Sequence, residues 1–158
     1  MAKKIGIIGV GLLGGALAHR FSNQGWEVIG HDHKATSTEM LTMCDLATEL
    51  VMQCKTVLLS LPTSDVVSKV INSLGSTITN QHCFIDTTTG KPEEMIEVGE
   101  TLDRLGANYL EANIAGSSVL TKTGNATLFL GGEKGVINSQ QDLLNALTLK
   151  QLHLGLVG

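Results

Sequence analysis

The sequence predicts a single α/β domain built on a doubly wound, mostly parallel sheet. Three observations lead to this fold class. Short apolar runs rich in β-branched residues alternate with amphipathic helical segments along the whole chain. A glycine-rich turn joins the first run to the first helical segment. The length of 158 residues is that of one ordinary domain, and 18 glycines with only 2 prolines indicate many tight turns and no linker.

The first unit of this fold is predicted over residues 3–32. Residues 3–8 form an apolar strand, and from Leu12 the apolar spacing turns helical until Gly25, a residue type that commonly follows a helix end. Residues 27–32, EVIGHD, are predicted as the second strand. Strand, glycine loop, helix and strand together make one βαβ unit.

The same alternation continues along the rest of the chain. A helix is expected to begin at Ser64, whose hydroxyl would cap it, and another at Pro92, with Gly106 after its end. The remaining predicted elements are strands at residues 56–61, 83–86, 109–112, 127–130 and 151–154, and a helix over residues 136–146. Because these strands are almost continuously apolar, we expect helices to cover both faces of the sheet.

The composition excludes two classes of partner. Charged residues make up only 16% of the chain and the net charge is −4, which gives no electrostatic reason to expect nucleic acid or an anionic membrane. The apolar run at residues 5–18 follows two lysines, as in a secretory signal peptide. It contains five glycines, which weaken the helix such a peptide needs, and its 14 residues are too few to span a bilayer.

The cysteines favour a reduced, cytoplasmic setting. Cys44, Cys54 and Cys83 are odd in number and have no CxxC spacing, so neither a disulfide framework nor a zinc site is expected. We expect them to be buried apolar side chains. His31 and His33 have a spacing that can chelate a metal, but no further ligand lies near them in sequence, so exposed histidines and no metal are expected.

The motif that carries chemistry is GxGxxG, formed by Gly9, Gly11 and Gly14. It follows a predicted strand, opens a predicted helix and precedes an acidic residue at the end of the next strand, which is the context of a Rossmann-type dinucleotide site. We expect Gly9 to permit the tight turn, Gly11 to give a pyrophosphate access to the backbone, and Gly14 to let the helix pack close to the sheet. The pyrophosphate would then lie on the helix N-terminus.

Asp32 predicts the preferred cofactor. Its carboxylate can accept hydrogen bonds from both hydroxyls of the adenosine ribose, and its charge would repel a 2′-phosphate, so NAD is favoured over NADP. His33 and Lys34 follow directly and would soften that preference.

The order of further segments resembles the β-hydroxyacid dehydrogenases, the family of 3-hydroxyisobutyrate dehydrogenase, tartronate semialdehyde reductase and 6-phosphogluconate dehydrogenase. The resemblance covers essentially all 158 residues. It rests on the opening IGIIGVGLLGGALA, LPTSDVV at residues 61–67, DTTTGKP at residues 86–92 and EANIAGSSVLTKTGNATLFLGG at residues 111–132. It implies an NAD-binding domain of an oxidoreductase that acts on a hydroxyacid.

The resemblance also implies the site residues. The cofactor site would comprise Gly9, Gly11, Leu12, Leu13, Gly14, Asp32, His33, Leu61, Pro62 and Thr89. Leu61 and Pro62 would line the adenosine side, and Thr89 would lie near the nicotinamide. Ala115, Gly116 and Ser117 stand where the family has Ser-Gly-Gly for the substrate, so the serine hydroxyl is missing; Asn113 replaces a proline.

The family's general acid–base is a lysine on the helix after this domain. The resemblance places that lysine beyond Gly158, together with the family's all-α domain, which closes the substrate pocket and forms the dimer. Lys91 and Lys122 do not match its position, and we expect both to be surface lysines. We therefore expect this chain to bind NAD without turning over a hydroxyacid alone. We also expect self-association through a surface near residues 114–120 and the C-terminus.

Three hypotheses follow for the function. The first is the cofactor-binding domain of an NAD-dependent β-hydroxyacid dehydrogenase. The second is a free-standing dinucleotide-binding module, a sensor or a subunit, without catalysis. The third is a reductase of the same fold that acts on an imine or another non-acid substrate, with the altered loop at residues 113–118 as the cause.

Overall fold

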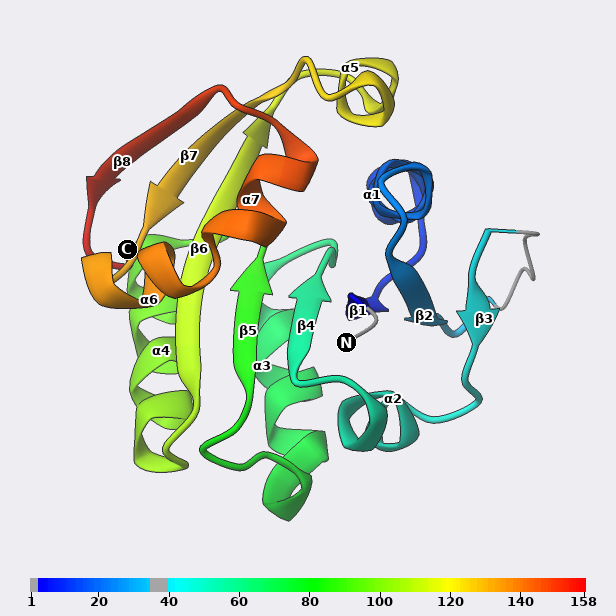
Figure 1. Ribbon diagram of the computed structural model, residues 1–158. Coiled ribbons are helices and arrows are strands. Elements are labelled where there is room, and N and C mark those ends of the chain that lie inside the picture. Colours follow the sequence, from blue (N-terminus) through cyan, green and yellow to red (C-terminus); the bar gives the residue numbers. More distant parts are fainter. Residues whose placement is uncertain (1–2, 35–39) are drawn as a thin grey trace.

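A computed structural model describes residues 3–34 and 40–158, in which strands and helices alternate along the chain (Figure 1). Its first part contains β1 (Lys4–Ile8), α1 (Leu12–Asn23), β2 (Glu27–His31), β3 (Thr42–Met43), α2 (Ala47–Gln53), β4 (Thr56–Leu59), α3 (Ser64–Leu74), β5 (Cys83–Asp86), α4 (Pro92–Arg104) and β6 (Asn108–Ala115). The second part contains α5 (Ser118–Thr123), β7 (Thr127–Gly131), α6 (Lys134–Ser139), α7 (Gln141–Leu147) and β8 (Gln151–Gly155).

The strands form an eight-stranded sheet in the order β3-β2-β1-β4-β5-β6-β7-β8. Neighbouring strands run parallel except β6 and β7, which are antiparallel. The predicted single α/β domain with a doubly wound, mostly parallel sheet is therefore confirmed. The chain runs outward from β1 to β3 and then returns to place β4 beside β1, so the loops after β1 and β4 leave the sheet in opposite directions. This reversal is where open α/β sheets form their ligand crevice.

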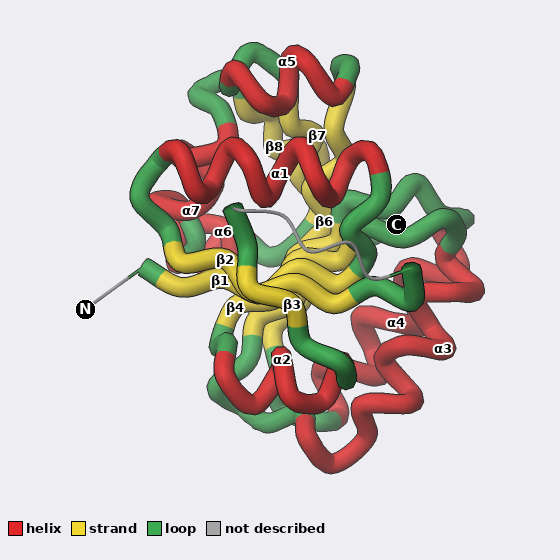
Figure 2. Tube along the Cα trace, turned by 90° about the vertical axis from the view of Figure 1, so that its right-hand side faces the viewer, coloured by secondary structure: helices red, strands yellow, loops and turns green. Residues whose placement is uncertain are grey.

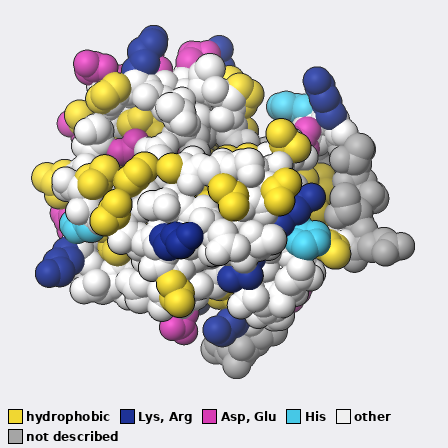
Figure 3. Space-filling model, turned by 90° about the horizontal axis from the view of Figure 1, so that it is seen from above, with side chains coloured by type: hydrophobic (Ala, Val, Ile, Leu, Met, Phe, Trp, Pro, Cys, Tyr) yellow, Lys and Arg dark blue, Asp and Glu magenta, His cyan; other side chains and the backbone are white. Residues whose placement is uncertain are grey.

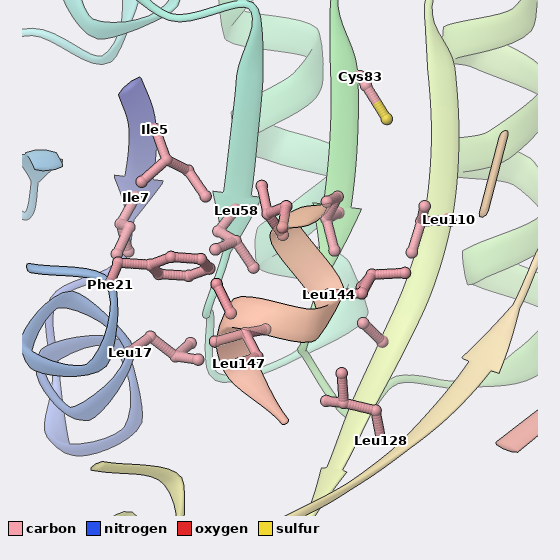
Figure 4. Close-up of a cluster of buried hydrophobic side chains, with 14 of the residues drawn as sticks. Ile5, Ile7, Leu17, Phe21, Leu58, Cys83, Leu110, Leu128, Leu144 and Leu147 are labelled. Carbon is pink, nitrogen blue, oxygen red and sulfur yellow. The ribbon is translucent and has the colours of Figure 1, made fainter. Parts of the chain in front are cut away.

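Helices cover both faces of the sheet (Figure 2). On one face, Leu17 and Phe21 of α1 pack against Leu58 of the sheet and Leu147 of α7 (Figure 4). The opposite face is covered by α2, α3 and α4, and its core includes Phe84. Each fully buried side chain of this kind contributes about 1.5–3 kcal/mol through the hydrophobic effect. The sheet is thus held from both sides, and its carboxyl edge is a rigid base for loops.

Two details of the prediction are wrong. Thr63, not Ser64, caps α3: its Oγ1 accepts a hydrogen bond from the N–H of Val66 at 3.4 Å. Ser64 is instead the first helical residue and is buried. The single helix predicted over residues 136–146 is two helices, with Gln140 between them in a non-helical conformation. The Ser139 hydroxyl donates to the carbonyl oxygen of Val136 at 2.6 Å, an interaction that competes with helix continuation.

The short strand β3, the short helices α2 and α5 and a 3-10 turn at Gly75–Thr77 were not predicted. The strand β4 also ends two residues earlier than predicted, at Leu59, because Ser60 and Leu61 turn into the loop that precedes α3. No helix in the described part of the chain combines the length and the apolar character needed to cross a bilayer.

Candidate functional site

A cleft of about 810 Å³ lies at the carboxyl ends of β1, β4 and β5, where the strand order reverses. Its lining comes from the β1–α1 loop, the segment after β2, the β4–α3 loop, α3 and the loop after β5. The lining residues are Ile8, Gly9, Val10, Gly11, Leu12, Leu13, His31, Asp32, His33, Lys34, Ala47, Ser60, Leu61, Pro62, Val66, Val70, Ser73, Thr87, Thr88 and Thr89. The lining is mainly apolar with a few polar groups, as in small-molecule sites generally.

The glycine loop forms one wall of the cleft, and each of its three glycines has a distinct environment. Gly9 has φ of +93°, which L residues rarely adopt, and a Cβ there would lie 2.1 Å from the Ser60 carbonyl oxygen. A Cβ on Gly14 would lie 1.9 Å from the Gly9 carbonyl oxygen, so α1 packs against the loop more closely than any side chain allows. A Cβ on Gly11 would meet no atom of residues 3–34 and 40–158 within 4 Å. Gly11 thus exposes backbone at the cleft.

The N-terminus of α1 points its first N–H groups at the same space. Gly11 is the N-cap residue and has no side chain with which to cap the helix, and the first turn of α1 contains no acidic residue. The first N–H groups of a helix have no partner within the helix and carry the positive end of its dipole. This end of α1 therefore favours an anionic group such as a phosphate.

Asp32 follows directly after β2 and lines the cleft beside the glycine loop. One carboxylate oxygen accepts a hydrogen bond from the N–H of Lys34, and the other accepts one from the N–H of Val10, both at 2.8 Å. These two N–H groups hold the pKa of Asp32 below its usual range against the opposing effect of partial burial. A carboxylate has about four acceptor positions, so two remain free for hydroxyl donors. Asp32 is thus an oriented, ionised acceptor.

The second wall consists of the β4–α3 loop and the loop after β5. The N–H of Leu61 donates to the Thr88 hydroxyl oxygen at 3.1 Å, which joins the two loops. Both the N–H and the hydroxyl of Thr87 donate to the carbonyl oxygen of Leu59, at 2.9 and 2.8 Å. Thr87 and Thr88 are buried, whereas Thr89 is exposed at the surface of the cleft.

The histidines and cysteines differ in their surroundings. His31 and His33 both line the cleft, and their rings meet edge to face with centroids 5.8 Å apart. Within the described residues, no group of three His, Cys, Asp or Glu side chains is arranged to hold a metal ion. All three cysteines are free, and burial raises the pKa of Cys54 to about 11 and that of Cys83 to about 12. Cys44 is only half-buried, unlike the other two.

The structure brings nearly all of the predicted cofactor residues together in one cleft. The residues Gly9, Gly11, Leu12, Leu13, Asp32, His33, Leu61, Pro62 and Thr89 line it, and Gly14 lies directly beneath the loop. The predicted substrate residues Ala115, Gly116 and Ser117 lie outside its lining, at the exposed end of β6. There the Ser117 hydroxyl caps α5 by accepting from the N–H of Leu120 at 3.2 Å.

Sequence reasoning missed three residues that shape the cleft. Val10 supplies the N–H that orients Asp32, Ser60 supplies the carbonyl that closes on Gly9, and Thr88 joins the two loops of the second wall. The first two contribute only backbone atoms, which no residue pattern identifies. Thr88 lies in the DTTTG segment, so it was visible, but nothing in the sequence distinguished it from Thr89.

The fold, the crevice at the strand reversal and the glycine loop at a helix N-terminus define a Rossmann-type dinucleotide-binding domain. The chain belongs to the family of the NAD-binding domain of 6-phosphogluconate dehydrogenase, which matches it over residues 4–155. Its cofactor class is therefore a nicotinamide dinucleotide, and NAD is the cofactor by which the family is defined.

Individual relatives agree with this family. The mitochondrial 3-hydroxyisobutyrate dehydrogenase of Rattus norvegicus is 24% identical over 168 residues, covering 100% of this chain and 50% of the rat enzyme. The structure of 3-hydroxyisobutyrate dehydrogenase from Mycobacterium tuberculosis with L-serine superposes with a TM-score of 0.93 at 22% identity, covering 99% of this chain and 56% of the other.

A second solved structure has a different named activity. The imine reductase of Myxococcus stipitatus, in a variant complexed with NAD⁺, superposes with a TM-score of 0.90 at 19% identity, covering 98% of this chain and 55% of the other. The chain thus has the fold of the NAD-binding domains of such dehydrogenases and imine reductases. It spans about half the length of these three proteins.

Proposed function

We propose that this chain is the cofactor-binding part of an oxidoreductase that transfers hydride between NAD and a small β-hydroxyacid. The observation that carries the proposal is the cleft in which an uncapped helix N-terminus and the oriented carboxylate of Asp32 face the same space. Two relatives are named for the oxidation of hydroxyacids, 3-hydroxyisobutyrate dehydrogenase and 2-(hydroxymethyl)glutarate dehydrogenase, and they support a hydroxyacid as the proposed substrate class.

In this proposal each wall of the cleft binds one part of the cofactor. The pyrophosphate lies on the N–H groups of Gly11, Leu12 and Leu13, in the space that a Cβ on Gly11 would enter. Asp32, beside His33, accepts hydrogen bonds from the hydroxyls of the adenosine ribose, and its negative charge disfavours the 2′-phosphate of NADP. Leu61 and Pro62 line the adenosine side.

The nicotinamide half is assigned to the loop after β5, beside the exposed Thr89. When bound, NAD accepts or donates the hydride, and the residues described here bind and orient it. The proton of a substrate hydroxyl needs a base, and we assign that role to no residue of these 158. Lys91 is exposed and paired with Glu94 at 2.7 Å, and Lys122 is exposed on α5, so neither is a candidate.

Two measurements test the proposal. Calorimetric titration of the purified chain should give micromolar binding of NAD and binding of NADP at least tenfold weaker, because Asp32 repels a 2′-phosphate. Equal affinities for the two cofactors would contradict the assignment of Asp32. A dehydrogenase rate measured from the chain alone with 3-hydroxyisobutyrate would contradict the placement of the base outside it.

A second candidate is the reduction of an imine. The observation in its favour is the segment from Asn113 to Ser117, where Ala115 has no hydroxyl and the buried Asn113 Oδ1 finds no hydrogen-bond partner among the described residues. The likeness in fold to imine reductases is consistent with it. Assays with a cyclic imine and with a β-hydroxyacid, on a form of the protein that has activity, separate the two reactions.

The third candidate is a dinucleotide-binding module without catalysis. It predicts the same NAD affinity, and it predicts that no form of the protein expressed in its source cells oxidises a hydroxyacid or reduces an imine. An immunoblot that finds a band near 16.7 kDa would favour this candidate, and a band near twice that mass would favour the dehydrogenase.

We also propose a cytoplasmic setting and self-association. Three free cysteines fit a reducing compartment. Figure 3 shows several hydrophobic side chains exposed on the upper side of the molecule, the side on which Figure 1 draws α5. Val119 and Leu120 of α5 are exposed, and so are Leu154 and Leu156 near the C-terminus. Sedimentation analysis over a hundredfold concentration range should show association, and a monomer throughout that range would contradict it.

A further inference from the structure

Three polar side chains are buried behind the second wall of the cleft. Asp86, at the end of β5, has no solvent exposure, Tyr109 of β6 is 7% exposed and Thr88 is 2% exposed. Tyr109 belongs to the apolar cluster on the face covered by α2, α3 and α4, which also contains Phe84 and Met95. Burial of polar groups in such surroundings is unfavourable unless each one is hydrogen-bonded.

The three residues are joined in one hydrogen-bonded chain, in which Thr88 takes part through both its backbone N–H and its hydroxyl. The Tyr109 hydroxyl donates to Asp86 Oδ2 at 3.0 Å, and the N–H of Thr88 donates to Asp86 Oδ1 at 2.8 Å. The Thr88 hydroxyl oxygen in turn accepts from the N–H of Leu61 at 3.1 Å. The chain therefore runs from β6, through the end of β5, to the β4–α3 loop. Its last two residues line the cleft.

We propose that Tyr109, Asp86 and Thr88 are positioning residues for the cofactor: by fixing the second wall of the cleft they set its affinity for NAD, although Tyr109 and Asp86 do not line it. The inference rests on NAD binding in the cleft and not on the hydroxyacid reaction. Leu61 and Thr89 both belong to this wall, and the position of Thr88 determines where each of them lies.

The raised pKa of Asp86 predicts that this hydrogen-bonded chain responds to pH. Burial raises the pKa of Asp86 to about 6, against the opposing hydrogen bonds from Thr88 and Tyr109. The titratable groups that face it are Tyr109 and Glu111, both on β6, and the negative charge of Glu111 raises its pKa further. The Met95 sulfur of α4 contacts the Tyr109 hydroxyl at 3.9 Å and carries no charge. A proton on Asp86 removes an acceptor at the centre of the chain.

Thr88→Val is the direct test of the chain, since it removes the acceptor for the N–H of Leu61 and keeps the side-chain shape. Thr148→Val is its matched control. Thr148 is also 2% exposed, and its hydroxyl accepts a backbone N–H, that of Lys150, at the same 3.1 Å, but it lies outside the cleft lining. We expect T88V to weaken NAD binding about tenfold, T88S to restore it, and T148V to leave it unchanged.

Tyr109→Phe tests the other end of the chain by removing one hydroxyl that does not line the cleft. We expect about a threefold to tenfold loss of NAD affinity near neutral pH. Because the Tyr109 hydrogen bond lowers the pKa of Asp86, its removal should also shift the acid-side loss of affinity to higher pH. A role in stability alone would shift the unfolding midpoint and leave the affinity profile unchanged.

The pH profile gives the sharpest discrimination. Asp86 is an acid whose pKa is raised in the folded protein, so acidification from pH 7.5 to 5 stabilises the fold through this group. The positioning role predicts that NAD affinity falls over the same range. Since His31 and His33 also line the cleft, the profile is read as the difference between the wild-type protein and D86N, in which this component should be absent.

Each outcome decides the proposal. It is overturned if Y109F and T88V bind NAD with the wild-type dissociation constant, or if the affinity of D86N has the wild-type pH dependence. If T88V does not fold, Y109F and D86N still decide. If the wild-type protein binds no NAD at any pH, the cofactor site itself is wrong, which is a different result from wild-type affinity in the variants.

Discussion

The two walls of the cleft are built in different ways. The wall formed by the β1–α1 loop is made of backbone atoms in close contact. Gly9 packs against the carbonyl oxygen of Ser60, and Gly14 packs against the carbonyl oxygen of Gly9. The opposite wall is held by side chains, through Thr88 to Leu61 and through Asp86 to Tyr109. The wall formed by the β1–α1 loop is therefore disturbed when a side-chain atom is added. The opposite wall is disturbed when a hydrogen bond is removed or when Asp86 takes up a proton.

The largest effect is expected from Gly14→Ala. Its Cβ would lie 1.9 Å from the Gly9 carbonyl oxygen, so α1 or the loop must move, and we expect a loss of about 3 kcal/mol or more in the free energy of unfolding. Gly15→Ala is the matched control, since a Cβ there meets no atom within 4 Å and alanine favours a helix by up to about 1 kcal/mol. Urea unfolding of both variants measures the difference. Equal stabilities would contradict the backbone account of this wall.

The second-largest effect separates binding from folding at the same loop. Gly11→Ala adds a Cβ into open space, so we expect the free energy of unfolding to change by less than about 1 kcal/mol. The added methyl group enters the proposed pyrophosphate position, and NAD binding should weaken about 100-fold, or about 2.7 kcal/mol. Titration calorimetry measures it. Binding within threefold of the wild-type protein would place the pyrophosphate elsewhere.

A smaller effect is expected at Asp32, the acidic residue in the lining of the cleft. Asp32→Asn keeps the side-chain shape and removes the charge, so NAD binding should weaken about tenfold and the preference over NADP should fall. Asp103→Asn makes the same change at an exposed position on α4 and should alter neither affinity. If D32N kept the wild-type ratio of the two affinities, another group would set the cofactor preference.

The same contrast explains how much the sequence could predict. The βαβ unit and the glycine roles follow from local spacing, because Gly9, Gly14 and Asp32 lie within one continuous segment. At each of these positions the motif requires one particular type of residue. Contacts of the second wall join residues far apart in sequence, 27 positions between Leu61 and Thr88 and 23 between Asp86 and Tyr109. Periodicity gives no information about such pairs, so Asp86 was predicted only as the end of a strand.

Smaller failures have the same origin. The cap of α3 is displaced by one residue from the prediction, because Thr63 and Ser64 are both acceptable caps in isolation. Only the fold shows that the Ser64 hydroxyl donates to a carboxylate oxygen of Glu94 at 2.5 Å and accepts from the N–H of Lys91 at 3.1 Å. The two-residue strand β3 has no periodicity to detect. The substrate residues Ala115, Gly116 and Ser117 were assigned from the resemblance alone, and that assignment stays a prediction.

The smallest expected effect concerns stability at the second wall. The pKa of Asp86 is about 6 in the folded protein against 3.8 for an ordinary aspartate, so between these values the folded chain binds more protons than the unfolded chain. Stability from this group is therefore complete at low pH and is lost as the pH rises through about 6. Between pH 5 and 7.5 the loss should be about 1 kcal/mol, because one pKa unit corresponds to about 1.4 kcal/mol.

Urea unfolding of the wild-type protein and D86N at both pH values isolates this component, since all other titrating groups are common to the two. The wild-type protein should lose about 1 kcal/mol more than D86N on going from pH 5 to 7.5. Asp32, whose pKa is lowered, contributes with the opposite sign and at lower pH, so it does not offset the difference. If both proteins lose the same stability, Asp86 is already ionised at pH 5, and the second wall would depend on its hydrogen bonds alone.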